Sequence, residues 1–133
     1  MMEAVRLQVE IDEAARSLEK SYERALRRIE RLKDSLNTLE ETTRCDKGPG
    51  NAGRMKTLDS AAGSLNRLSD SLIARSKKAW QTYERLEHKC KATGLEMTRL
   101  SNVQVLCKKT ESMAADLLCY TLGRLRHKEN LSA

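Results

Sequence analysis

Residues 4–41, AVRLQVEIDEAARSLEKSYERALRRIERLKDSLNTLEE, decide the fold of this chain, because their apolar side chains recur every seven residues. One series is Ile11, Leu18, Ala25, Leu32 and Leu39, and the other is Ala15, Tyr22, Ile29 and Leu36. The two series interleave in alternating steps of four and three, which is the a and d pattern of a heptad repeat. Residues 1–44 are therefore predicted to form one long amphipathic helix of the coiled-coil type.

The segment that follows carries the strongest helix-breaking signal in the chain. Residues 45–53 contain three of the six glycines and the single proline, Pro49. Proline disfavours helix at the residue before it, and glycine permits left-handed backbone. We expect a loop over 45–53, and a loop of this length between two amphipathic helices predicts an antiparallel hairpin.

The second arm of the hairpin is expected to start near Arg54. Leu58, Leu65 and Leu72 are spaced by seven, the phase slips near Arg75, and it then resumes. The alternation of four and three also continues through Gly94, along Leu86, Cys90, Thr93, Met97 and Leu100. This continuity favours one long helix over 54–126, with a possible break or bend at 93–95, followed by a flexible tail at 127–133.

The predicted fold class is thus all-α, an antiparallel long helical hairpin with a long, possibly bent C-terminal helix. The alternative is a turn at Thr93 and Gly94, which gives three helices of similar length in a spectrin-like bundle. The two architectures differ in what they leave uncovered. A hairpin with such unequal arms leaves a long apolar stripe in water, so it requires partner helices. A three-helix bundle covers its own stripes.

The favoured functional hypothesis is a non-catalytic coiled-coil subunit or adaptor of a larger intracellular assembly of the cytoskeletal, trafficking or cell-division type. Its partners would be other helical proteins, in hetero- or homo-oligomers. On the first helix the predicted partner-binding residues are Ile11, Leu18, Tyr22, Ile29, Leu32, Leu36 and Leu39. On the C-terminal arm they are Met97, Leu100, Met113, Leu117, Leu118 and Leu125.

Charge supports a second hypothesis, in which a self-contained helical bundle binds nucleic acid or another acidic polymer through a basic face. The chain carries a formal net charge of +6, and the excess is concentrated in residues 54–93, with nine basic and four acidic side chains. Basic clusters lie at Arg24 to Arg31, at Lys77 and Lys78, and at Lys108 and Lys109. No aromatic residues are interleaved to stack bases, and solvated helix flanks are the simpler interpretation of these clusters.

Neither catalysis nor a cofactor is expected. The chain has two histidines, His88 and His127, and His88 follows Glu84 by four residues, which indicates a simple helical pair rather than a general base. The glycines of 48–53 lack the Lys and Ser or Thr of a phosphate-binding loop. The four cysteines are widely spaced, which does not predict a metal site. No apolar run approaches a membrane span, so we expect a cytoplasmic or nuclear protein without a small-molecule substrate.

One short motif lies near the C-terminus. Lys128, Glu129 and Asn130 resemble the KEN box, a degron that the anaphase-promoting complex recognises. The resemblance covers three residues, and it implies a link to cell division.

Overall fold

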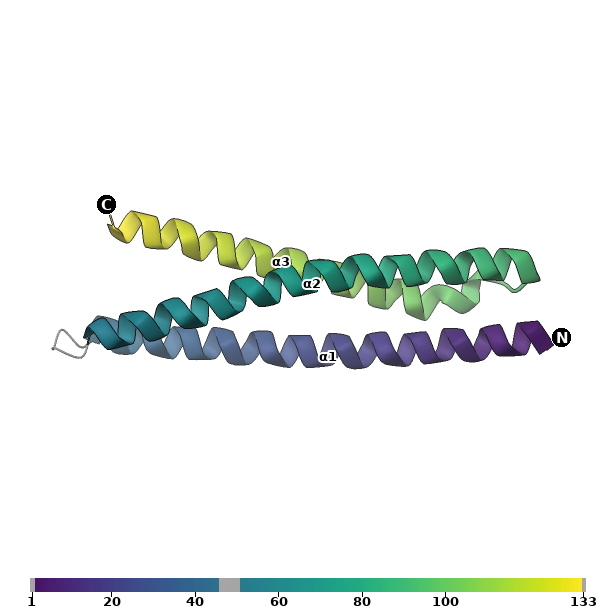
Figure 1. Cartoon of the computed structure of the whole chain (residues 1–133), viewed down its shortest axis with the longest axis horizontal. Helices are drawn as coiled ribbons and strands as arrows, with labels where there is room; N and C mark the ends of the chain where they lie inside the picture. The colour runs from purple at the N-terminus through teal and green to yellow at the C-terminus, as the bar shows by residue number, and fades with distance from the viewer. Residues whose placement is uncertain (1, 46–50, 133) are drawn as a thin grey trace.

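A computed structural model describes residues 2–45 and 51–132, without the side chains of 43–45, 51, 52, 54, 55 and 125–132. The chain forms helices α1 (Met2–Cys45), α2 (Asn51–Thr93) and α3 (Ser101–Ser132), and a short 3-10 helix, η1 (Met97–Leu100), leads into α3. The three long helices lie lengthwise against one another in an elongated bundle (Figure 1). α2 runs antiparallel to both α1 and α3. The all-α fold class is confirmed, and the described residues include no strand.

The expectation of a single helix over 54–126 is wrong, and the alternative with a turn at Thr93 and Gly94 is what the structure contains. Gly94 has a φ of +75°, and the N–H of Leu95 donates to the carbonyl oxygen of Cys90 at 3.0 Å. This bond and a left-handed glycine one residue after the helix end define a Schellman C-cap. Gly94 therefore terminates α2 and does not lie inside a continuous helix.

The continuous heptad phase across this turn is a coincidence of spacing. Cys90 and Leu100 are both fully buried, whereas Thr93 and Met97, which connect them in the heptad pattern, are exposed. Leu100 follows Cys90 by ten residues. The heptad steps from Cys90 to Thr93, from Thr93 to Met97 and from Met97 to Leu100 are three, four and three residues, which also sum to ten. The chain leaves the helix and re-enters the core at a spacing that an unbroken helix would have produced.

The other expected boundaries move by a few residues. α1 extends to Cys45 and α2 begins at Asn51, so helix occupies both ends of the expected loop over 45–53. The centre of that loop, 46–50, lies outside the described residues. The expected tail over 127–133 is helical up to Ser132, as the end of α3.

The core consists of two apolar clusters, each built from all three helices. Near the turn at Gly94, one cluster contains Leu7, Ile11, Ala79, Leu86, Cys90, Leu100, Val103 and Cys107. Toward the other end, the second contains Ala25, Ile29, Leu36, Leu65, Leu68, Leu72, Met113, Ala114 and Leu117. Where the heptad phase slips, the buried positions are occupied by the small residues Ser69 and Ser76. The apolar stripes of the chain thus cover one another.

Candidate basic binding face

The predicted partner-binding residues of α1 lie in or beside the core. Ile11, Ile29 and Leu36 are buried, and the side chains of Leu18, Tyr22 and Leu32 are half-buried against the two clusters. Leu39 is half-buried as well. The surface that we expected another chain to cover is therefore covered by α2 and α3. This set supports the fold of the chain itself.

The predicted set on the C-terminal arm divides into two groups. Leu100, Met113 and Leu117 are buried in the core. Met97 and Leu118 are 38% and 39% exposed, and the side chain of Leu125 is outside the described part. Of this set, Met97 and Leu118 thus keep apolar surface available to a partner.

Charged side chains of both signs lie along α1. Asp12, Glu19 and Arg16 line a shallow groove between α1 and α3 together with Lys109 of α3, and farther along Glu40 pairs with Arg124 of α3. Glu10 contacts α2, and the positions seven, fourteen and twenty-one residues later hold Ser17, Arg24 and Arg31. This second series is therefore poorer in acids than the first.

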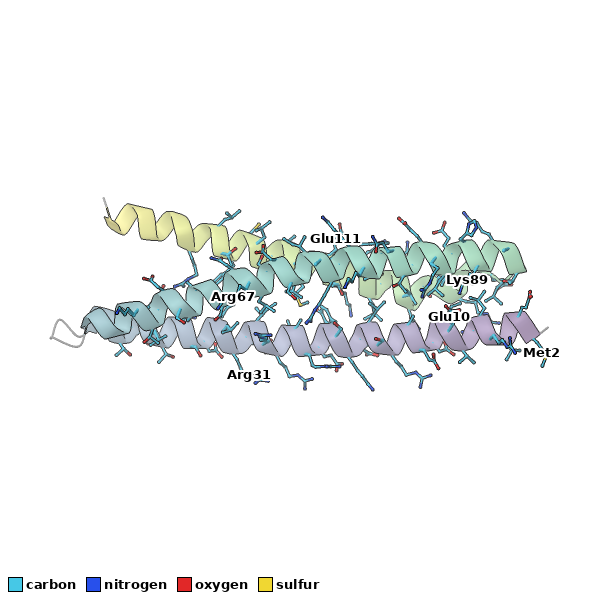
Figure 2. The ribbon with its side chains drawn as sticks, in the orientation of Figure 1. Met2, Glu10, Arg31, Arg67, Lys89 and Glu111 are labelled. Carbon is cyan, nitrogen blue, oxygen red and sulfur yellow. The ribbon has the colours of Figure 1, made fainter. Side chains whose placement is uncertain are left out.

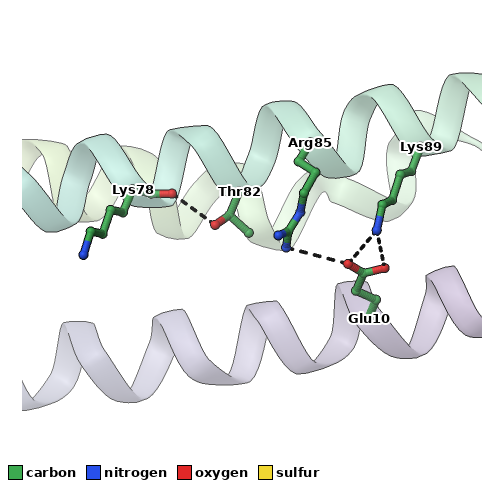
Figure 3. A network of polar contacts seen from close by, with 5 residues as sticks. All are labelled: Glu10, Lys78, Thr82, Arg85 and Lys89. Atoms are coloured by element: carbon green, nitrogen blue, oxygen red, sulfur yellow. Dashed lines mark hydrogen bonds and ion pairs between the residues drawn. The ribbon is translucent and has the colours of Figure 1, made fainter.

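Glu10 identifies the α1 side that faces α2, because it bridges the two helices. Its carboxylate accepts hydrogen bonds from Lys89 Nζ at 3.0 and 3.1 Å, and Arg85 Nη2 lies 3.7 Å from its Oε1 (Figure 3). Lys78, seven residues before Arg85, extends from α2 into the same space between the helices, and there it has no carboxylate within reach among the residues drawn (Figure 3). The carboxylate of Glu10 is already shared by two cations.

Beyond this ion pair, α1 and α2 carry a set of exposed cations, which we call the basic face. It consists of Lys20, Arg24, Arg28, Arg31, Arg67, Arg75 and Lys78. All seven are exposed, and among the described side chains none of them forms an ion pair. Arg31 of α1 and Arg67 of α2 lie at about the same level along the bundle, and Arg31 extends from the edge of α1 away from α2 (Figure 2).

Serine hydroxyls accompany these cations on the same helix sides. Ser17, Ser21 and Ser35 of α1 and Ser71 of α2 occupy neighbouring positions, and among the described hydrogen bonds their hydroxyls take part in none. Acids border these positions as well, because Glu23, Asp34 and Asp70 each follow a cation of the set by three residues. The surface therefore offers guanidinium, ammonium and hydroxyl donors next to a smaller number of carboxylates.

The basic clusters that stand out in the sequence make up part of this face. Arg24, Arg28, Arg31 and Lys78 belong to those clusters, whereas Lys20, Arg67 and Arg75 lie outside them and were missed. The signal that finds Arg67 and Arg75 is their spacing relative to Ser71 and Lys78, by four and by three residues, which places them on one helix side. That signal becomes informative only once the side of α2 that packs toward α1 is known.

The described residues contain no cluster of metal-ligating side chains. No group of three His, Cys, Asp or Glu side chains gathers there, and His88 is exposed on α2. Cys90 and Cys107 are free and fully buried, and burial raises the pKa of the Cys107 thiol to about 11. A raised thiol pKa keeps the sulfur neutral and unreactive at physiological pH.

The KEN-like residues 128–130 lie within α3 and not in a tail beyond it. Their side chains are outside the described part of the structure, so the degron remains a prediction from the sequence. None of the helices, over the residues described, is long and apolar enough to cross a membrane.

Comparisons with protein-family models, with curated proteins and with solved structures gave no match for this chain.

Proposed function

We propose that this protein is a non-catalytic binding module that holds a negatively charged macromolecule on its basic face. The observation that carries the proposal is the set of seven exposed cations of α1 and α2, with no ion pair among the described side chains. Exposed Lys and Arg side chains usually have acids interspersed with them on the same surface. Here Glu23, Asp34 and Asp70 lie near the cations but form no ion pair with them among the described side chains, so the cations keep their charge available to a ligand.

The closed core supports this hypothesis over that of an obligate subunit, which the heptad pattern favours. An obligate subunit is expected where a long apolar stripe remains uncovered, as in a hairpin. In the three-helix bundle the stripe residues Ile11, Leu36, Leu100 and Leu117 are at most 2% exposed. A chain that covers its own core has no need of partner helices for folding, and its interactions are then carried by its surface.

Retention on immobilised heparin, a generic polyanion, tests the proposal. The triple variant Arg24→Gln, Arg28→Gln, Arg67→Gln removes three charges from the basic face and should elute at clearly lower salt than the unchanged protein. The matched control is Lys77→Gln, Lys91→Gln, Lys108→Gln, which removes three exposed charges from other sides of the bundle. Equal shifts of the two triple variants would show that retention follows net charge alone, and the proposal would then fail.

A second candidate is the subunit or adaptor role, which exposed apolar side chains favour. Met2, Val5 and Val9, spaced by three and four on the first turns of α1, are 77%, 65% and 49% exposed. This spacing presents one apolar edge suited to a partner helix. Light scattering of the full chain at increasing concentration tests self-association, and Val5→Asp with Val9→Asp should abolish any association that this edge mediates.

A further inference from the structure

The basic face lacks the apolar centre that protein partners and membranes use. The exposed large hydrophobic residues among the described side chains are Met2, Val5, Val9, Leu26, Met97, Val105, Leu118 and Leu122. None of them is among the positions of the basic face: the first four lie on other positions of α1, and the rest lie in η1 or on α3. Protein interfaces derive most of their binding energy from buried aromatic and apolar anchors, and peripheral membrane helices insert apolar side chains. A ligand bound through charge and hydrogen bonds alone fits this surface better.

The donor chemistry of the face favours phosphate as the anion. Five of the seven cations are arginines, whose planar guanidinium groups bind phosphate with two parallel hydrogen bonds. The serine hydroxyls of Ser17, Ser21, Ser35 and Ser71 are further donors of the kind that contact phosphate oxygens in nucleic-acid complexes. A repeating series of phosphates would engage both helices at once.

The aromatic residues are placed away from this face, which bears on whether bases are read. Trp80 Nε1 donates to Glu111 of α3 at 2.9 Å, so the ring is held on the side of α2 that faces α3. Tyr22 and Tyr120 lie beneath Lys109 and Lys33, respectively, between α1 and α3. Single-stranded nucleic acid is usually held by stacking its bases on aromatic rings. A surface without such rings is suited to a duplex, whose bases are already stacked.

We propose, resting on the function proposed above, that the ligand of the basic face is the phosphodiester backbone of a nucleic-acid duplex, bound without sequence preference. The cations of α1 extend from Lys20 to Arg31, which is about 16 Å along a helix. A B-form duplex carries one charge per about 1.7 Å of its axis, so this length spans on the order of ten phosphates. The seven cations of α1 and α2 match part of that charge, and the rest of the duplex remains solvated.

Fluorescence anisotropy with a labelled DNA duplex of about 24 base pairs measures the number of phosphates engaged. The logarithm of the binding constant should fall linearly with the logarithm of the salt concentration, with a slope of about −4.5 to −6 for five to seven contacts. The variant Arg24→Gln, Arg28→Gln, Arg67→Gln should reduce the steepness of this slope by about 2.7, because three contacts are lost. The control Lys77→Gln, Lys91→Gln, Lys108→Gln should keep the slope of the unchanged protein, and helical circular dichroism shows that both variants are folded.

Other ligands in the same assay show which class of polyanion the basic face prefers. A second duplex of unrelated sequence should bind within about threefold of the first, and an RNA duplex shows whether A-form geometry is accepted equally. Tighter binding to a single strand, to polyglutamate or to phosphatidylserine vesicles than to either duplex would overturn the inference. Heparin retention through the basic face without duplex binding would refute the duplex proposal and leave the proposed function standing, whereas loss of both would refute both.

Discussion

Glu10 and Lys89, seventy-nine residues apart in the sequence, join the N-terminal part of α1 to the C-terminal part of α2 through two hydrogen bonds of 3.0 and 3.1 Å. The side chains are 37% and 46% exposed, so water competes with the bond. Exposed ion pairs contribute on the order of 0–1 kcal/mol to stability. The same carboxylate also approaches Arg85 at 3.7 Å, so one negative charge is shared by two cations.

Replacing Glu10 with Gln should therefore have a small effect on stability and a clear effect on binding. We expect the free energy of unfolding to fall by less than about 1 kcal/mol, measured by urea denaturation. Lys89 and Arg85 lose the carboxylate that they share, so the protein should elute from heparin at a higher salt concentration. Glu84→Gln makes the same change of charge at an exposed position of α2 away from this face. If both variants raised the elution salt equally, Glu10 would have no special relation to the basic face.

Gly94 and Gly123 make a matched pair for testing the turn. A Cβ would meet nothing within 4 Å at either position, but Gly94 has a φ of +75° and Gly123 lies within α3. Gly94→Ala should lower the free energy of unfolding by about 1 kcal/mol, because a side chain is strained in left-handed backbone. Gly123→Ala should raise it by about 0.5–1 kcal/mol, because alanine is the better helix former.

Thermal unfolding of the two glycine variants shows whether each substitution stabilises or destabilises the protein. Opposite shifts of the midpoint temperature support a capped turn at Gly94. A stabilising effect of Gly94→Ala would instead show that residue 94 belongs to a continuous helix, which would restore the hairpin that the heptad phase suggested.

The contrast between residues 4–41 and the region of Gly94 shows what the sequence can and cannot predict. The periodicity of Ile11 to Leu39 predicts a helix with an apolar side, because only a helix brings residues seven apart together, and the structure contains that helix. Periodicity says nothing about the neighbour that covers the apolar side. Whether another chain or the chain's own α3 covers this side depends on whether the chain turns at Gly94. The sequence does not decide this, because glycine is compatible with both a helix interior and a left-handed cap.

The basic face was predictable only in part for a related reason. Arg24, Arg28 and Arg31 appear as a cluster because they are close in sequence. Their level along the bundle relative to Arg67 on α2 depends on the antiparallel register of the two helices. The pair of Glu10 and Lys89 shows this register, and heptad spacing leaves it undetermined.

Leu36 tests whether the apolar series of α1 forms the core of the chain itself. It is fully buried within the cluster that all three helices build. Leu36→Ala should lower the free energy of unfolding by about 2–5 kcal/mol in the isolated protein, because a cavity replaces the lost side chain. Leu122→Ala, at a position that is 50% exposed, should change it by less than about 0.5 kcal/mol. Urea denaturation of both variants as purified single chains makes the comparison, and a small effect at Leu36 would show that its contacts require another chain.

Burial of Cys107 makes the stability of the bundle sensitive to alkaline pH. Its thiol is inaccessible to solvent, and burial raises its pKa from 9.0 to about 11, with the charge of Glu111 adding to the effect. The unfolded chain ionises this thiol near pH 9, whereas the folded chain holds the proton up to about pH 11. The contribution of Cys107 is thus fully present below about pH 9 and is lost as the pH rises from about 9 to about 11.

Comparing unfolding at about pH 8 and at about pH 10.5 isolates this contribution. The unchanged protein should lose more stability between the two values than Cys107→Ala, which has no thiol at this position to ionise. Cys119→Ala is the control, because it removes a thiol that lies on the surface and outside the core. Iodoacetamide at about pH 8.5, followed by peptide mass analysis, should modify Cys119 in the folded protein and leave Cys90 and Cys107 unmodified until urea is added. Rapid modification of Cys107 without urea would contradict its place in the closed core, since a thiol sealed between three packed helices reacts only when they separate.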